Sequence, residues 1–353
     1  MGERGREITT TFLSASEVYS MSTLNVPVSH NQKSVQETVQ HPQWLDKQLY
    51  PFQSHFVEIE GNRIHYIDEG SGPIVLFVHP GFGWSFTNRE IIKGLRDRYR
   101  CIALDLPGFG LSPASPTYRH TLIGDSRLIE RFIQTLGLTG ITLFGQDITG
   151  SAAFGVMGRH PEWFRAAIIL EGFLWSVKKE VRVYPMIQLV GSPFLRFLSN
   201  TFNFFIAYSL ATLKKKGQQK FSVQEMKAYR GPTLKREVRR HPHDLFHSAT
   251  KSDDYLVDLE KRLQSLSAPI RPANDAAASS FAQAGRAEKG MPALLIFSDA
   301  DIVVKMGWLQ HMEQLFPNHR SIVLQGSHHF PQEYDPASVV TEIRRWLDEE
   351  IYS

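Results

Sequence analysis

The fold is decided at the stretch Gly145-Gln146-Asp147-Ile148-Thr149-Gly150. Residues 140–144 before it, of which Ile141, Leu143 and Phe144 are apolar, predict a short buried strand, and residues 151–160 after it predict a helix. A strand that enters a helix through a Gly-x-nucleophile-x-small turn holds the central side chain in a strained, exposed position. Gly145 and Thr149 are small enough to let the strand and the helix approach closely. We therefore expect Asp147 to act as a nucleophile, the alternative role for an aspartate here being a helix N-cap.

Strand and helix patterns alternate on both sides of this turn. Two runs flank the hairpin signal Glu60-Gly61-Asn62. Five further continuous apolar runs are typical of buried parallel strands, and they occupy residues 74–78, 101–104, 165–170, 292–297 and 321–324. Together with the strand before Asp147, this rhythm predicts an α/β fold with an eight-stranded, mostly parallel, doubly wound sheet.

The alternation stops between residues 172 and 249, where the chain is helical, aromatic and basic. We predict that this segment is a helical cap inserted into a core formed by residues 46–171 and 250–353. Its most apolar part, residues 193–213, is interrupted by polar residues, and we interpret it as a buried cap helix rather than a membrane-surface helix. Residues 1–45 are polar and without a period, which predicts a largely disordered N-terminal extension.

The composition excludes several classes of protein. Of the 353 residues, 42% are hydrophobic and 21% charged, which is typical of a soluble globular protein, and the net charge of +3 is too weak to favour nucleic-acid binding. The single cysteine, Cys101, lies in an apolar run and is expected to be a buried structural residue. No stretch predicts stable membrane insertion or a secretory signal, so we expect a cytoplasmic protein, and the oligomeric state stays open.

Reactive groups are expected where parallel strands end, because their carboxyl ends meet at one edge of the sheet. Asp147, Asp301 and His329 each follow such a strand, in the order nucleophile, acid, histidine. His329 has a neighbour, His328, and only one of the two can face the site. We choose His329 because Phe330 can pack behind it.

The acid has two competitors. Asp299 lies two residues before Asp301, where it can cap a turn, and Glu171 ends the strand at residues 165–170. We place Asp301 first and keep Glu171 as the alternative acid.

An aspartate nucleophile changes the reaction from that of a serine. A carboxylate attacks a saturated carbon directly and forms an ester of the enzyme, and His329 then activates a water that hydrolyses this ester. The backbone N–H groups of Ile148 and of Gly81 or Phe82 are expected to hold the oxyanion of the second step. This chemistry needs water and a small apolar organic substrate.

Several stretches resemble those of the haloalkane dehalogenases of the α/β-hydrolase superfamily, and are similar to those of the related epoxide hydrolases. They are Tyr50-Pro51-Phe52, His65-Tyr66-Ile67-Asp68-Glu69-Gly70, Trp84-Ser85-Phe86, Asp105-Leu106-Pro107-Gly108-Phe109-Gly110-Leu111-Ser112, Gln146-Asp147, Ala228-Tyr229-Arg230-Gly231-Pro232 and His329-Phe330-Pro331-Gln332-Glu333. The resemblance covers roughly residues 44–353. It implies a cap over an apolar pocket, an aspartate–histidine–acid triad, no metal or cofactor, and hydrolysis of carbon–halogen bonds.

Two positions depart from the dehalogenase pattern. The residue after the nucleophile is usually a tryptophan that binds the departing halide, and here it is Ile148. The usual His-Gly-Asn-Pro loop, whose asparagine is the second halide donor, reads His79-Pro80-Gly81-Phe82. A buried anion without donors is costly. Trp84 and Trp175 are candidates to supply an indole N–H, and packing is the alternative for each.

The predicted substrate-pocket residues are Phe82, Trp84, Trp175 and Tyr229. Two other functions stay open. An epoxide hydrolase would need hydroxyl donors from the cap, for which the candidates are Tyr184, Tyr208, Tyr229 and Tyr255. A catalytically weak scaffold is the other alternative, although the intact triad argues against it.

Overall fold

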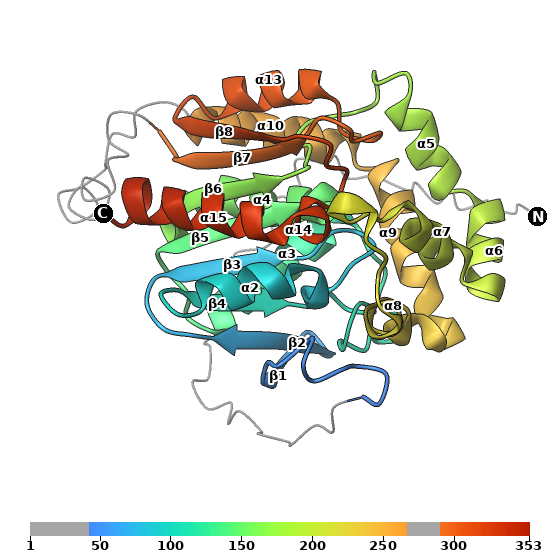
Figure 1. Ribbon diagram of the computed structural model, residues 1–353. Helices are drawn as coiled ribbons and strands as arrows, with labels where there is room; N and C mark the ends of the chain where they lie inside the picture. The colour runs from blue at the N-terminus through green and yellow to red at the C-terminus, as the bar shows by residue number, and fades with distance from the viewer. Residues whose placement is uncertain (1–41, 267–289) are drawn as a thin grey trace, which may run out of the picture. The chain divides into compact units, whose positions relative to one another are not determined.

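The computed structural model describes residues 42–266 and 290–353 (Figure 1). The predicted N-terminal extension lies outside these residues except for its last four. Within those four, Leu45 is 4% exposed, and the ring of Trp44 lies 5.9 Å from that of Trp84. The packed part of the chain thus includes residues 44 and 45.

The predicted eight-stranded, mostly parallel sheet is confirmed, with the strand order β1-β2-β4-β3-β5-β6-β7-β8. β1 and β2 form the predicted hairpin, β2 pairs antiparallel with β4, and all later pairs are parallel. The strands are β1 (Ser54–Ile59), β2 (Asn62–Glu69), β3 (Ile74–Val78), β4 (Arg100–Leu104), β5 (Ile141–Gln146), β6 (Phe164–Leu170), β7 (Ala293–Ser298) and β8 (His319–Leu324).

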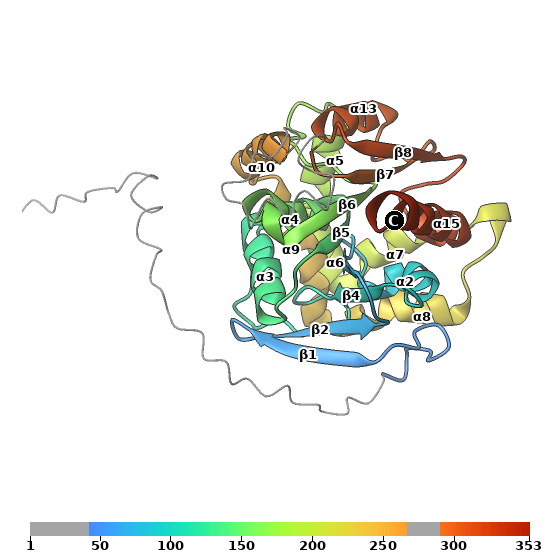
Figure 2. The ribbon, with the colours of Figure 1, turned by 90° about the vertical axis from the view of Figure 1, so that its left-hand side faces the viewer.

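Helices cover both faces of the sheet because its central strands are apolar on both sides (Figure 2). In β3, Val75 and Phe77 belong to the apolar cluster on one face, and Leu76 and Val78 to that on the other. Cys101 is buried, as predicted. One face carries α2 (Arg89–Leu95) and α15 (Pro336–Trp346), and the other carries α3 (Leu122–Thr135), α4 (Asp147–Arg159), α10 (Asp253–Leu266) and α13 (Met306–Leu315).

The segment between β6 and α10, which we call the cap segment (residues 172–249), is helical as predicted. Its helices lie together at one end of the sheet (Figure 1) and are α5 (Val183–Val190), α6 (Pro193–Phe202), α7 (Phe204–Thr212), α8 (Val223–Arg230) and α9 (Arg240–Ala249). Local signals start two of them: the Ser192 hydroxyl accepts from the Leu195 N–H, and Ser222 and Glu225 form a capping box.

The prediction of one buried helix over residues 193–213 is wrong. Asn203 adopts a left-handed conformation, with φ of 54°, and divides the stretch into α6 and α7, both of which expose aromatic side chains. Within the described residues, none of the helices is long and apolar enough to cross a membrane. Shorter helical turns occur at Ser85–Asn88, Pro161–Trp163, Lys216–Gln218, Gly231–Leu234, Arg236–Arg239, Pro331–Tyr334 (α14) and Leu347–Ile351.

Candidate active site

Asp147 lies in the predicted sharp turn between β5 and α4. Its φ of 55° is left-handed, a conformation that costs a non-glycine residue free energy and is often found at functional sites. The turn closes because Gly145 and Gly150 meet: a Cβ added to Gly145 would lie 3.2 Å from the Gly150 Cα and 2.7 Å from the Phe154 ring. The helix N-cap is Gln146, so the carboxylate of Asp147 is not used as a cap.

Backbone donors hold the Asp147 carboxylate. The N–H of Gly81 donates to its Oδ2 at 3.1 Å, and the N–H of Ile148 hydrogen bonds to the same carboxylate. These are the two groups that the sequence predicted for the oxyanion hole. Burial raises the pKa of Asp147, while the charge of His329 and the two N–H groups oppose that rise. The Thr149 hydroxyl donates to the carbonyl of His79 and so ties the loop to the turn.

His329 lies between the nucleophile and the acid. Its Nδ1 is 2.7 Å from Asp301 Oδ2, and its Nε2 is 3.9 Å from Asp147 Oδ1. Burial alone would lower the pKa of His329, but the charge and hydrogen bond of Asp301 and the charge of Asp147 raise it to about 9. His328 is directed elsewhere, since its Nδ1 is 2.9 Å from the carbonyl of Ala300.

Glu171 is fully buried beside this pair, in a left-handed conformation with φ of 44°. A carboxylate oxygen of Glu171, one of Asp301 and an imidazole nitrogen of His329 all lie within 4.8 Å of one another. Burial and the charge of Asp301 raise the pKa of Glu171 well above its usual range. Burial also acts against ionisation of Asp301, but His329 outweighs it and holds the pKa of Asp301 low. The structure therefore favours Asp301 over Glu171 as the partner of the imidazole.

The same contacts explain the role of Asp299, the remaining acid candidate, and bear on whether this cluster could hold a metal ion. Asp299 accepts the N–H of Gly326 at 2.7 Å, which is a turn contact. The cluster of Glu171, Asp301 and His329 has the donor types that hold a cation, but the direct 2.7 Å contact between imidazole and carboxylate leaves no position for an ion between those two groups.

The surroundings of Asp147 are apolar. The ring of Phe82 lies 4.4 Å from that of Phe330 and 6.2 Å from that of Phe205 on α7. Leu245 on α9 also reaches the site, because a Cβ added to Gly81 would lie 3.3 Å from its Cδ2. Of the predicted pocket residues, Phe82 thus lies between Phe330, the residue after His329, and Phe205 of the cap segment.

The other three predicted pocket residues make contacts with other groups, and their place in a substrate pocket stays a prediction. Trp84 is 2% exposed, and its indole N–H donates to the Ala228 carbonyl at 3.1 Å. Trp175 packs on α13, with its ring 4.2 Å from that of His311. The Tyr229 hydroxyl donates to Glu333 Oε1 at 2.6 Å. Packing was the alternative for both tryptophans, and it is what the structure shows.

Two of the other tyrosines considered as donors have a different partner or face solvent. The hydroxyl of Tyr255 donates to the carbonyl of Ser151 at 3.1 Å, and Tyr208 is 57% exposed. Together with Tyr229, three of the four candidates therefore show no contact with Asp147 in the described residues. This weakens the epoxide-hydrolase alternative.

A buried polar network behind His329 was missed from the sequence. Arg89 on α2 is 2% exposed, and its Nη2 lies 3.0 Å from Glu333 Oε2 and 3.1 Å from Glu225 Oε1. With Tyr229, these groups join α2, the cap segment and α14, the short helix that follows His329. The only local signals were the capping box at Glu225 and the position of Glu333 four residues after the histidine.

A second missed contact joins the histidine loop to the nucleophile turn. The side-chain amide of Gln146 donates to the His329 carbonyl at 2.8 Å, and Gln332 donates in turn to the Gln146 side chain at 2.5 Å. This pair fixes the position of the imidazole relative to the residue next to Asp147.

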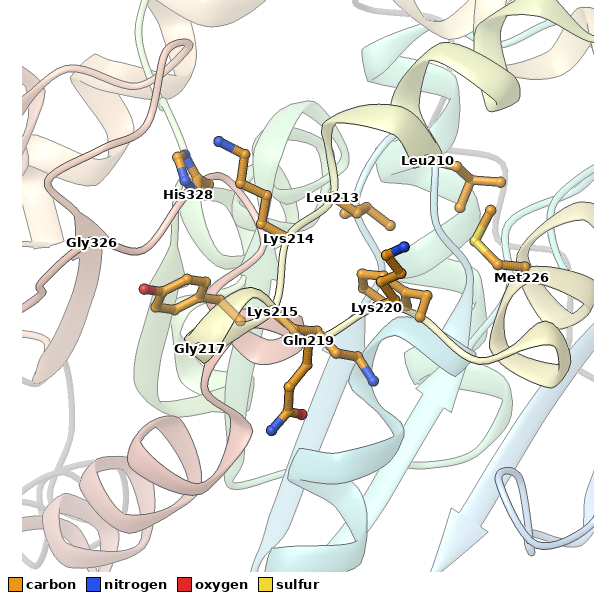
Figure 3. A pocket seen from close by; sticks show the side chains of 12 residues that line it. Leu210, Leu213, Lys214, Lys215, Gly217, Gln219, Lys220, Met226, Gly326 and His328 are labelled. Atoms are coloured by element: carbon orange, nitrogen blue, oxygen red, sulfur yellow. The ribbon is translucent and has the colours of Figure 1, made fainter.

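A cavity of about 850 Å³ lies beside His328, between the chain around α7 and α8 and the chain after β8 (Figure 3). Asp147 and His329 do not line it. Its walls carry apolar side chains together with basic ones, and they are formed by Leu210, Leu213, Lys214, Lys215, Gly217, Gln219, Lys220, Phe221, Met226, Gly326, His328 and Tyr334.

Comparison with known proteins agrees with this fold. A protein family described as the alpha/beta hydrolase fold matches residues 73–336. The chain is 34% identical over 161 residues to haloalkane dehalogenase 2 of Mycobacterium bovis, an alignment that covers 46% of this chain and 56% of that relative. It is 26% identical over 305 residues to a cis-3-alkyl-4-alkyloxetan-2-one decarboxylase of Xanthomonas campestris. That alignment covers 82% of this chain and 93% of the relative. The crystal structure of the haloalkane dehalogenase DatA from Agrobacterium tumefaciens superposes with a TM-score of 0.68 at 19% identity. The superposition covers 84% of this chain and 96% of the DatA chain.

Proposed function

Since the chain belongs to the α/β-hydrolase family, we propose that it acts through an ester formed between Asp147 and a saturated carbon of its substrate. The observation that carries this proposal is the placement of Asp147. Its carboxylate is held by the backbone N–H groups of Gly81 and Ile148, and the His329–Asp301 pair stands opposite.

In the first step, one oxygen of Asp147 attacks the substrate carbon and displaces the leaving group. His329, with a pKa of about 9, is an imidazolium at neutral pH and stabilises the two carboxylates beside it. Alkylation removes the charge of Asp147, and with it one cause of that raised pKa. His329 then loses its proton more readily and becomes available as a base.

In the second step, neutral His329 removes a proton from a water that attacks the Asp147 carboxyl carbon, and Asp301 keeps the ring oriented. The negative charge develops on the carboxyl oxygen of Asp147 itself. The Gly81 N–H, at 3.1 Å from Oδ2, is therefore already placed to stabilise that oxyanion.

Haloalkanes are the leading substrate class, which the names of relatives support. The expected products are an alcohol and a halide. Ile148 has no side-chain donor for the halide and neither has Phe82, while the indole of Trp84 is bound to Ala228. Turnover should therefore be slow and should rise strongly from chloroalkanes to bromoalkanes and iodoalkanes.

Opening of an oxetan-2-one is a second candidate, favoured by the longer alignment with the decarboxylase and by the lack of halide donors. Asp147 would attack the ring carbon that bears the ring oxygen, so that this C–O bond breaks and a free carboxylate forms. That carboxylate leaves as CO₂, its bonding electrons form the carbon–carbon double bond, and the bond to Asp147 breaks. The products are an alkene, CO₂ and the original enzyme, and no water is consumed.

Parallel product assays separate these functions. We would measure halide from bromoalkanes, alkene and CO₂ from a cis-3,4-dialkyl oxetan-2-one, and diol from styrene oxide, with Asp147→Asn as the control. On the hydrolysed substrate, His329→Gln should accumulate the ester as a mass increase on the peptide that contains Asp147. Unchanged turnover in Asp147→Asn would refute the proposal that Asp147 is the nucleophile. The absence of product from all of these substrates would favour the alternative of a catalytically weak scaffold.

A further inference from the structure

The outer surface of the cap segment is unusually aromatic. On α6 and α7 five aromatic side chains are exposed, and we call them the aromatic face: Phe194 (66%), Phe197 (61%), Phe202 (68%), Phe204 (41%) and Tyr208 (57%). The rings of Phe204 and Tyr208 stack at 6.2 Å, one turn apart on α7. Leu189 on the preceding helix is 58% exposed. A soluble protein rarely exposes so many large apolar groups on consecutive helices unless they bind something.

This exposure follows from how the two helices pack. α6 buries Ser199, and α7 buries Ile206, Ser209 and Leu210, so each helix meets the rest of the protein along a narrow strip. The remaining faces are still apolar, and packing inside the chain cannot use them. The aromatic face is thus separate from the side of the cap segment on which Phe205 reaches the catalytic site.

The cap segment is also strongly basic. Residues 172–249 contain 14 Lys and Arg against 4 Asp and Glu, a net charge of +10, whereas the rest of the chain has 25 against 32, a net charge of −7. Arg196 stands between Phe194 and Phe197 in the sequence of α6; its side chain is 45% exposed, and its Nη1 lies 3.6 Å from Asp244 Oδ1 on α9. Arg239 donates to the carbonyls of Asn200 and Thr201, which places its guanidinium at the end of α6.

The positive charge continues past the end of α7. Lys214 and Lys220 are exposed and line the cavity in Figure 3. The aromatic face therefore has cations beside it, and its binding partner should be apolar inside and anionic at its surface.

We propose that the aromatic face docks the cap segment reversibly onto an anionic lipid bilayer. Helices of 10 and 9 residues are too short to span a bilayer, but they can lie in its interface with aromatic side chains inserted and cations at the headgroups. A second copy of the chain fits less well, because a symmetric contact through this face would bring two cap segments of net charge +10 together. The proposal does not depend on the chemistry at Asp147.

Vesicle flotation tests this proposal with the full chain. We expect binding to vesicles of phosphatidylcholine mixed with phosphatidylglycerol, weak binding to phosphatidylcholine alone, and loss of binding as salt is raised. Phe194→Ser combined with Phe197→Ser should reduce the partition coefficient about tenfold or more. Lys214→Glu combined with Lys220→Glu should reduce it by about tenfold on the anionic vesicles.

Ile123→Ser is the matched control, since Ile123 is 40% exposed on α3, outside the cap segment, and its replacement should leave vesicle binding unchanged. All variants change exposed side chains, so equal thermal midpoints would show that each one folds. Equal partitioning of the double phenylalanine variant and the control would overturn the proposal, as would equal binding to neutral and anionic vesicles. Failure to bind vesicles, together with a dimer that the phenylalanine substitutions dissociate in light scattering, would assign the face to a second copy instead.

Discussion

Replacing Arg89 by methionine should lower the free energy of unfolding by about 3–5 kcal/mol, because the buried carboxylate of Glu333 loses its cation, whereas Glu225 keeps Lys215 at 2.7 Å. The Arg89, Glu333 and Glu225 side chains are 2%, 1% and 8% exposed, so water cannot take over the role of the guanidinium. Burial opposes the charge of Arg89, but Glu333 outweighs it and raises the pKa of the guanidinium. Methionine fills similar space, so most of the loss comes from the unpaired charge of Glu333.

Urea unfolding followed by circular dichroism at neutral pH measures this loss. The control is Arg96→Met, which removes an ion pair with Glu69 at 2.9 Å in which Arg96 is 37% exposed, and it should cost less than about 1 kcal/mol. Adding Glu333→Gln to Arg89→Met should recover part of the loss, since one buried charge disappears with it. If Arg89→Met costs no more than the Arg96 control, the claim that this network is desolvated is refuted.

The remaining predictions concern the catalytic groups. Asp301→Asn should reduce turnover by about 10³–10⁴-fold, whereas Glu171→Gln leaves the 2.7 Å contact between His329 and Asp301 in place and should change turnover less than about tenfold; equal losses would point to Glu171 as the acid. Gly81→Ala should reduce turnover far more than the thermal midpoint, because the new methyl would lie 2.8 Å from Ile148 Cγ2 and 3.0 Å from Asp147 Oδ2, and an unchanged rate would contradict this. His329 has an ordinary pKa of 6.5 that rises to about 9 on folding, so its contribution of about 3 kcal/mol should be complete below pH 6.5 and lost as pH rises through 9. Urea unfolding of the wild type and His329→Gln across that range tests it, and a stability difference that grows with pH would contradict it.

The sequence by itself determined the sheet and the sharp turn that holds Asp147. Both depend on patterns within a few residues: continuous apolar runs such as that of β3, and small residues around Asp147 that allow a left-handed turn. The meeting of Asp147, Asp301 and His329 followed from the rule that parallel strands end at the same edge of a sheet.

Only the tertiary structure decided what depends on distances between remote segments. Asp301 rather than Glu171 contacts His329, and Trp84 and Tyr229 turn to the Ala228 carbonyl and Glu333. The apolar pattern of residues 193–213 predicted burial, yet α6 and α7 expose their aromatic rings. A hydrophobic pattern tells which side chains avoid water, whereas packing against the rest of the chain decides which of them are covered.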